Sequence, residues 1–245
     1  MQTEVMAWFE TAGRQLPWRS PGFTPWGSLV SEFMLQQTPV SRVVPKLELW
    51  LERWPTPADL AADSPGEAVR AWDKLGYPRR ALWLHACAVA IVERFDGEVP
   101  SSVGDLLSLP GVGPYTARAV AVFAFGAHEP VVDTNIRRVI ARHQKGLADQ
   151  GAPREKQDLA DMDALLPHSD RSPVFNQAVM ELGALVCTSK SPACDQCPIA
   201  ATCAWRRAGY PDNAEGTKPK QKKYEGSDRQ VRGAILALFR RAGHS

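Results

Sequence analysis

Hydrophobic residues recur along much of this chain at the spacing of an amphipathic helix, while strand-like alternation is almost absent. Leu29, Val30, Phe33 and Met34 form one such stripe. Similar stripes lie within 81–91, 117–125 and 175–186. The breaks between them are rich in Pro and Gly and fall at 19–23, 54–57, 97–100, 110–114 and 126–130. The pattern predicts an all-α protein with helices of about 8 to 16 residues.

Composition limits the class of protein. The chain has 245 residues, of which 44% are hydrophobic, enough for one large or two small domains with a buried core. Its first residues show neither a basic start nor a continuous apolar run, and no stretch is long enough to span a bilayer. We therefore expect a cytoplasmic protein that does not act at a membrane.

Charge is unevenly distributed. The net charge is +2, but residues 212–245 hold eight Lys or Arg against four Asp or Glu, which leaves residues 1–211 at −2. The basic stretch Lys218–Lys223 is predicted to be a solvated linker, followed by a short apolar element at Val231–Arg241. Because residues 1–211 carry no net positive charge, any binding of nucleic acid by this part of the chain must rest on local, directed contacts.

Four of the five cysteines lie within seventeen residues, at Cys187, Cys194, Cys197 and Cys203. Only one Cys-x-x-Cys pair is present and no His lies nearby, whereas structural zinc sites more often show two such pairs or a Cys/His mixture. Four thiolates separated by unequal loops favour an iron-sulfur cluster. Zinc and disulfides remain alternatives, although nothing else in the sequence suggests secretion.

A Gly-rich turn separates two predicted helices, at 103–108 and 114–125. Within Leu109–Ala117, Gly111, Val112 and Gly113 can bring backbone amides close to an anion, and the following helix N-terminus adds its positive dipole end. This arrangement is typical of a helix-hairpin-helix element that grips a DNA phosphate without Lys or Arg. A simple turn between two helices is the alternative.

An acidic residue, Asp133, follows the apolar pair Val131–Val132 about twenty positions past the hairpin, with Asn135 beside it. Taken alone, Asp133 is a helix cap. Together with the hairpin and the cysteine spacing, however, it resembles the superfamily of DNA glycosylases that includes endonuclease III. Segment Ser31–Thr38 is similar to the helix of adenine DNA glycosylases of the MutY type, with Glu32 at the position that faces the extruded adenine. Further similar segments are 16–19, 75–77, 139–142 and 175–183, so the resemblance spans about residues 5 to 211.

The resemblance implies a two-lobed, all-α helix-hairpin-helix glycosylase fold with an iron-sulfur cluster loop. One lobe, residues 20–130, is expected to be a six-helix barrel that contains the hairpin. The other combines residues 1–19 with 131–211 and holds the cluster. Residues 212–245 are expected to form the basic linker and the short C-terminal element.

The resemblance also implies a chemistry. Glu32, with a pKa raised by an apolar pocket, is expected to protonate N7 of adenine, while an ionised Asp133 stabilises the cationic sugar. Tyr115 stands where strand-nicking members carry a Lys, so a monofunctional, water-using enzyme is expected. The resemblance further implies a 4Fe-4S cluster on the four cysteines and a monomer that acts on double-stranded DNA with a mispaired adenine. Arg14, Trp18 and Arg19 are expected in the adenine pocket, with Asn135 beside Asp133. Gln36, Gln37 and Tyr77 are expected to contact the DNA.

Some features depart from the family. Thr134 replaces the usual Gly after Asp133, and Pro78 replaces a second aromatic residue after Tyr77. Typical members end in a Nudix-like domain that reads 8-oxoguanine, and no such domain is present in this sequence, so selectivity for 8-oxoguanine over guanine stays open. The alternatives are a non-catalytic iron-sulfur module that binds damaged DNA and a thymine or uracil mismatch glycosylase on the same fold.

Overall fold

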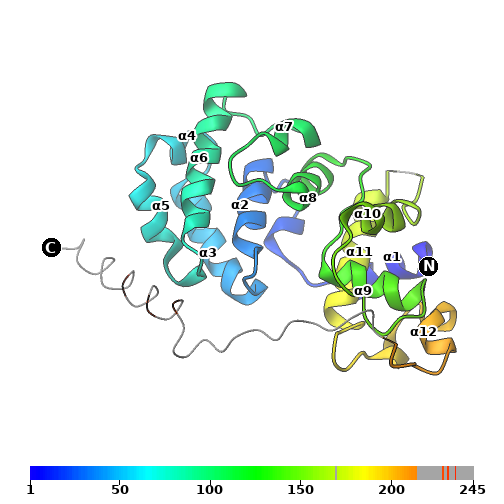
Figure 1. The fold of residues 1–245 in the computed structure, drawn as a ribbon. Coiled ribbons are helices and arrows are strands. Elements are labelled where there is room, and N and C mark those ends of the chain that lie inside the picture. The colour runs from blue at the N-terminus through cyan, green and yellow to red at the C-terminus, as the bar shows by residue number, and fades with distance from the viewer. Residues whose placement is uncertain (169, 214–227, 229–230, 232–234, 236–245) are drawn as a thin grey trace. The chain divides into compact units, whose positions relative to one another are not determined.

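The computed structural model describes residues 1–168 and 170–213, together with Asp228, Val231 and Ile235. The basic stretch 218–223 and most of the apolar element 231–241 lie outside the described residues. Residues 1–215 form one compact unit. Over the described residues the secondary structure is helical, without a strand, which confirms the all-α prediction (Figure 1). The α-helices are α1 (Gln2–Ala12), α2 (Pro25–Leu35), α3 (Val40–Arg53), α4 (Pro57–Ala62), α5 (Pro65–Trp72), α6 (Arg79–Arg94), α7 (Val103–Leu107), α8 (Pro114–Phe125), α9 (Thr134–His143), α10 (Glu155–Asp163), α11 (Ser172–Leu185) and α12 (Ala204–Arg207).

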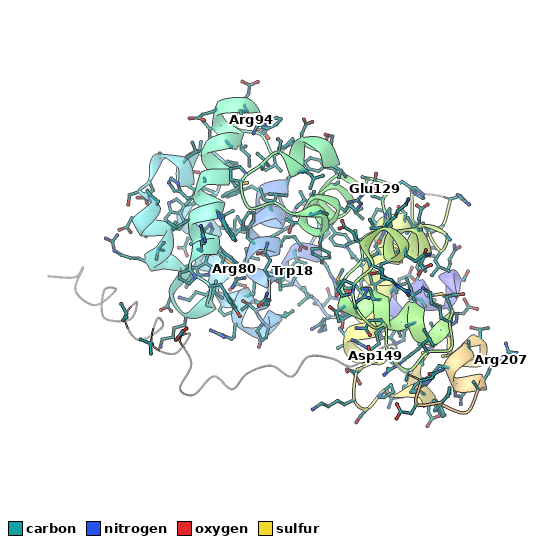
Figure 2. The ribbon with its side chains drawn as sticks, in the orientation of Figure 1. Trp18, Arg80, Arg94, Glu129, Asp149 and Arg207 are labelled. Atoms are coloured by element: carbon teal, nitrogen blue, oxygen red, sulfur yellow. The ribbon has the colours of Figure 1, made fainter. Side chains whose placement is uncertain are left out.

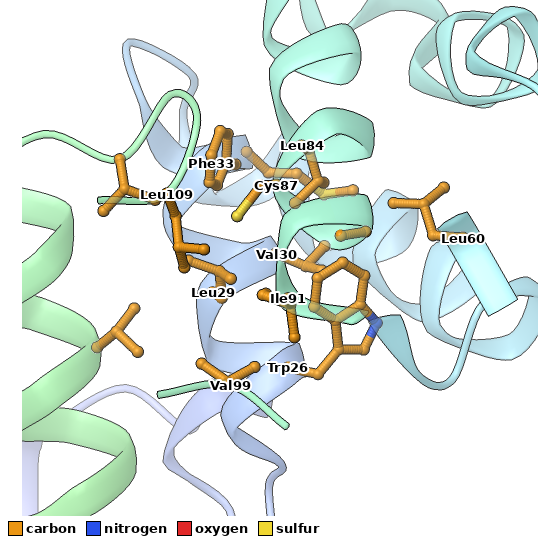
Figure 3. Packing of buried hydrophobic residues seen from close by; sticks show 14 of the residues in the cluster. Trp26, Leu29, Val30, Phe33, Leu60, Leu84, Cys87, Ile91, Val99 and Leu109 are labelled. Atoms are coloured by element: carbon orange, nitrogen blue, oxygen red, sulfur yellow. The ribbon is translucent and has the colours of Figure 1, made fainter. Parts of the chain in front are cut away.

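Helix α2 runs through the first hydrophobic core, which is built from residues 26 to 121. Its residues Trp26–Met34 are all buried. Figure 3 shows Leu29 and Phe33 of α2 packed among side chains that include Leu84 and Ile91 of α6. A helix buried on all sides is favourable only when apolar, so a carboxylate at Glu32 is an exception that requires an explanation.

Residues 20–130, all of which the structure describes, contain seven α-helices, α2 to α8. Two of them, α4 and α5, are separated by a short break at Ser64–Pro65, where the Ser64 side chain accepts a hydrogen bond from the backbone N–H of Glu67 and caps α5. The six-helix barrel that the resemblance implies for this range stays a prediction.

A second hydrophobic core joins the start of the chain to its later part. Val5 and Met6 of α1 pack with residues of α9 and α11, among them Ile136, Phe175 and Leu182. Helices α1 and α9 accordingly lie against α11 (Figure 1). The division into a lobe of residues 20–130 and a lobe of residues 1–19 with 131–211 stays a prediction. None of the described helices is long and apolar enough to cross a membrane.

Candidate active site

Glu32 is the buried carboxyl group of the site. Only 8% of the residue is exposed, and within the described part of the chain no hydrogen bond holds its carboxyl group. Burial raises the pKa of Glu32 to about 8, and the negative charge of Asp133 adds to the effect. Glu32 is therefore protonated at neutral pH, the state in which a carboxyl group can act as a general acid.

Asp133 caps the N-terminus of α9. Its Oδ1 accepts a 2.7 Å hydrogen bond from the backbone N–H of Ile136, and its Oδ2 accepts one of 2.8 Å from the amide of Asn135. Burial raises the pKa of Asp133, but these hydrogen bonds and the charge of Arg138 oppose the rise. Of the two carboxyl groups, Asp133 is the one surrounded by donors, and it is the one whose negative charge acts on Glu32.

A buried arginine links the cap to the cysteine segment. Arg138 donates from Nη2 to Oδ1 of Asn135 at 2.8 Å and to the carbonyl oxygen of Gly183 at 2.6 Å. Its Nε donates to the carbonyl oxygen of Cys187 at 2.6 Å. Because Arg138 occupies the amide oxygen of Asn135, the amide NH₂ is left to point at Asp133.

Tyr115 lies close enough to both carboxyl groups for their charges to act on its phenol. It lies in the first turn of α8 and is half-buried. Burial, together with the negative charges of Glu32 and Asp133, raises the pKa of Tyr115 well above its ordinary value. The phenol is consequently neutral. The structure thus brings together Glu32, Asp133 and Tyr115, as the sequence predicted, although their roles stay predictions at this point.

The hairpin forms as expected between α7 and α8. Gly111 has φ +76°, a region that glycine adopts without strain, and Gly113 is the N-cap of α8. A Cβ placed on Gly111 would lie 2.6 Å from Cβ of Trp83 and 3.0 Å from a ring atom of Phe33. Val112 is buried in the first core. The hairpin therefore packs directly against the residue that follows Glu32 on α2.

The expected pocket residues Arg14 and Arg19 are engaged with a buried acid. Arg14 binds the carboxylate of Glu181 with two side-chain hydrogen bonds of 2.7 Å, and Arg19 adds one of 3.0 Å. Burial alone raises the pKa of Glu181, but these donors outweigh it and lower the pKa to about 2. Trp18 packs against the first core (Figure 2). These contacts tie the N-terminal segment to α11, and a role in an adenine pocket stays a prediction.

The three residues expected to contact DNA bases lie at the turn after α2 and at the turn before α6. Gln36 is the C-cap of α2, and Gln37 follows it with φ +57°. Tyr77 precedes α6 with φ +46° and is 50% exposed. Positive φ is uncommon for residues other than glycine and occurs most often at functional sites. No described hydrogen bond joins these side chains to Glu32 or Asp133.

The cysteine segment provides a chemically suitable metal site. All five cysteines are free thiols. Four of them line one pocket with Arg142, Trp205 and Arg206. Nη1 of Arg142 donates to Sγ of Cys187 at 3.5 Å. Burial raises the pKa of Cys197 to about 11, so thiolates at this site require a bound cation.

The arrangement of the thiols along the chain favours a cluster over a zinc ion. Unequal loops separate the four cysteines and only one Cys-x-x-Cys pair is present, whereas structural zinc sites more often show two such pairs. The guanidinium groups of Arg142 and Arg206 line the same pocket and suit the negative charge of a cluster.

Comparisons with known proteins identify the family. A family model described as HhH-GPD superfamily base excision DNA repair protein matches residues 30–161, and the iron-sulfur binding domain of endonuclease III matches residues 187–203. The adenine DNA glycosylase of Mycobacterium tuberculosis is 52% identical over 98% of this chain and 78% of the relative. The chain belongs to the adenine DNA glycosylase family. This result confirms the resemblance seen in the sequence and the predicted iron-sulfur centre.

Other relatives agree with this assignment. The adenine DNA glycosylase of Mycolicibacterium smegmatis is 54% identical over 97% of this chain and 79% of the relative. The human adenine DNA glycosylase is 39% identical over 83% of this chain but only 39% of its own length. Among solved structures, a thermostable thymine-DNA glycosylase superposes with a TM-score of 0.77 at 26% identity over 84% of this chain and 94% of its own. An endonuclease III–DNA covalent intermediate gives 0.70 at 22% identity over 85% and 94%, which shows the shared fold.

Several residues that shape the site were not predicted from the sequence. Arg138 and Glu181 are two of them. A third is Asn176, whose Oδ1 accepts a 2.8 Å hydrogen bond from the backbone of Val131 and whose amide donates to the carbonyl oxygens of Glu129 and Ser172. Asn176 thereby fixes the segment that leads into Asp133. All three lie in or beside segments that resemble the family, but their partners are distant in sequence.

Proposed function

We propose that this member of the adenine DNA glycosylase family removes adenine that is mispaired with 8-oxoguanine or guanine in double-stranded DNA, by hydrolysing the N-glycosidic bond. The observation that supports this reaction best is the pair of buried carboxyl groups with different surroundings. Glu32 lies in an apolar helix with a pKa of about 8, and Asp133 lies among hydrogen-bond donors. Two carboxyl groups in different protonation states are the arrangement that glycosidic hydrolysis uses.

The proposed reaction starts with extrusion of the adenine nucleotide from the helical stack, which costs a few kcal/mol. Glu32 donates its proton to N7 of adenine. The bond between N9 and the sugar C1′ then breaks, and its electron pair leaves with the base. The sugar carries the resulting positive charge, which the carboxylate of Asp133 stabilises. Water adds to C1′ and gives its proton to the Glu32 carboxylate, which restores the acid and leaves an abasic site.

Tyr115 determines the type of product. Strand-nicking glycosylases need an amine at this position to form a Schiff base, and the phenol of Tyr115 has no nitrogen with which to form one. The enzyme is therefore monofunctional, and the abasic strand stays intact until it is treated with alkali.

The iron-sulfur cluster is held by Cys187, Cys194, Cys197 and Cys203. When bound, it supplies a rigid tie within the cysteine segment, and the hydrolysis requires no change in its oxidation state. Arg138 connects this segment to the active site by hydrogen bonds, because it binds both the carbonyl oxygen of Cys187 and the side chain of Asn135. The hairpin amides at 111–113 bind phosphate. We expect a cytoplasmic monomer whose partner is double-stranded DNA.

The test is a single-turnover assay of base release on duplexes that carry adenine opposite 8-oxoguanine, guanine, cytosine or thymine, with the released base identified by chromatography. The proposal expects adenine from the first two duplexes and an abasic strand that breaks only after alkali. Release of thymine or uracil from mismatched duplexes instead would favour the alternative glycosylase. DNA binding with no base release from any duplex would favour the non-catalytic alternative.

A further inference from the structure

Arg80 is a buried cation without an acidic partner. It lies in the first turn of α6, is 4% exposed, and forms no ion pair in the described part of the chain (Figure 2). Its guanidinium instead donates six hydrogen bonds, five to backbone carbonyl oxygens and one to a hydroxyl. Its Nε is buried without a partner, so Nη1 and Nη2 carry all six bonds. A cation buried in this way is costly unless most of its donors are satisfied. The groups that accept these hydrogen bonds therefore indicate the structural role of Arg80.

One set of partners is the C-terminal end of α2. Nη1 of Arg80 donates to the carbonyl oxygens of Phe33 at 2.9 Å, Met34 at 3.0 Å and Gln36. The last carbonyl groups of a helix have no partner within the helix, and a cation is favoured at that end. Arg80 thus caps the helix that carries Glu32.

The other set lies in the turn before α6. Nη2 of Arg80 donates to the carbonyl oxygens of Leu75 at 3.3 Å and Gly76 at 3.0 Å, and to Oγ1 of Thr38 at 2.9 Å. The hydroxyl of Thr38 donates in turn to the carbonyl oxygen of Leu75 at 3.2 Å. The turns at 36–38 and 75–77 are consequently fastened to each other through one guanidinium and one hydroxyl.

The two fastened turns share an unusual backbone. Gln37 has φ +57° and Tyr77 has φ +46°, and each directly follows a residue whose carbonyl oxygen Arg80 binds. Such conformations are unfavourable for residues other than glycine and persist only where the surroundings hold them. The guanidinium also lies 5.7 Å from the centre of the Tyr77 ring. Burial lowers the pKa of Arg80 to about 10, so the charge remains in place at neutral pH.

We propose that Arg80 is a positioning residue for recognition of the mispaired base, because it fixes Gln37 and Tyr77 relative to each other and to the helix of Glu32. The inference rests on the proposed function, in which these two turns contact the DNA. Arg80 does not touch the substrate. It acts by holding the exposed residues Gln37 and Tyr77 in a fixed position relative to the helix that carries Glu32. These two residues can then contact a mispair only in the geometry that presents adenine to Glu32.

The first test measures binding specificity. Arg80→Lys is made in a Glu32→Gln background, which prevents excision, and Kd is measured by fluorescence anisotropy for a duplex with adenine opposite 8-oxoguanine and for a matched duplex. Lysine keeps the charge but cannot span both turns. The ratio of the two affinities should fall at least tenfold while the affinity for matched DNA stays within about twofold, since phosphate contacts elsewhere are retained. An unchanged ratio overturns the proposal.

The second test asks whether Arg80 acts through Tyr77. In a double-mutant cycle, Arg80→Lys should lose most of its effect on the affinity ratio once Tyr77→Ala is present, because the aromatic side chain that Arg80 positions has then been removed. Independent effects that multiply would contradict the proposal. Arg137→Lys is the matched control. Arg137 is also largely buried and binds the backbone carbonyl oxygens of Gln150 and Ala152, away from both turns. It should leave the ratio unchanged.

A third variant keeps the proposal testable if Arg80→Lys fails to fold. Thr38→Val removes only the hydroxyl that joins the two turns, and should lower the affinity ratio in the same direction by a smaller factor. A wild-type ratio for Thr38→Val in a folded protein overturns the proposal. These binding measurements are separate from base release, so a wild-type enzyme that releases no adenine overturns the proposed function without deciding the role of Arg80.

Discussion

Arg138 donates a 2.6 Å hydrogen bond from Nε to the carbonyl oxygen of Cys187. The same guanidinium binds Asn135, whose amide holds the carboxylate of Asp133. Cys187 is thereby connected, through Arg138 and Asn135, to the carboxylate that we propose stabilises the positive charge on the sugar. Disturbing the cluster should therefore disturb base excision, even though the reaction uses no redox step.

Arg138→Lys tests this connection. Lysine cannot reach Asn135 and the two carbonyl oxygens together, so the amide of Asn135 loses its fixed orientation. Loss of one hydrogen bond to a charged group costs about 1.5 to 3 kcal/mol, which corresponds to a fall of about 10- to 100-fold in the single-turnover rate. Arg137→Lys, one position earlier on the same helix, should keep a rate within about threefold of wild type. Equal rates for the two variants would contradict the connection.

The acid at position 32 should make the protein less stable at higher pH. The pKa of Glu32 is about 8 in the folded protein and near 4.5 when unfolded, so its contribution to stability is complete below pH 4.5 and is lost as the pH rises to about 8. Glu32→Gln does not lose stability in this way, because the amide of Gln does not titrate. Its free energy of unfolding should exceed that of wild type by on the order of 3 kcal/mol at pH 7.

The measurement is the Tm of both proteins at pH 5.5 and pH 8, with Glu181→Gln as a contrast. The advantage of Glu32→Gln should grow with pH. Glu181, whose pKa is held at about 2 by Arg14 and Arg19, contributes stability at both pH values, so Glu181→Gln should lower the Tm at each. A Tm difference between wild type and Glu32→Gln that does not change with pH would mean that Glu32 is not protonated in the native state.

The pH profile of excision should be bell-shaped. The rate should fall on the basic side as Glu32 loses its proton near pH 8 in the free enzyme. It should fall on the acid side as Asp133 is protonated, at a pH above the ordinary range of an exposed Asp because burial raises its pKa. The measurement is kcat/KM from pH 4.5 to 9.5. A profile that continues to rise above pH 9 would exclude Glu32 as the proton donor.

Gly111→Ala should weaken DNA binding through the hairpin. A side chain there meets both a positive φ and the close contacts with Trp83 and Phe33, so the hairpin must shift away from α2. We expect a loss of roughly 2 to 5 kcal/mol in stability, the combined range of backbone strain and overpacking. Gly97→Ala is the control, because Gly97 has φ +81° and no atom within 4 Å of its added Cβ. If both variants bind DNA equally well, the packing of the hairpin does not determine its affinity.

The sequence predicted the site where the relevant signal is local. The hairpin, the buried position of Glu32 and the cysteine quartet follow from residue types within a few positions of one another. Arg138 and Glu181 could not be assigned in the same way. Arg138 has one near partner, Asn135, but the two carbonyl oxygens that it also binds lie 45 and 49 positions away, and the partners of Glu181 lie 162 and 167 positions away.

The central claim is that Glu32 protonates the departing adenine, and the most direct measurement is the single-turnover rate of adenine release from a duplex with adenine opposite 8-oxoguanine, compared between wild type and Glu32→Gln. Gln keeps the size of the side chain but has no proton to donate. The account predicts that Glu32→Gln binds the duplex with a Kd within about threefold of wild type and releases adenine at least about 10²-fold more slowly. Release by Glu32→Gln at the wild-type rate would contradict it.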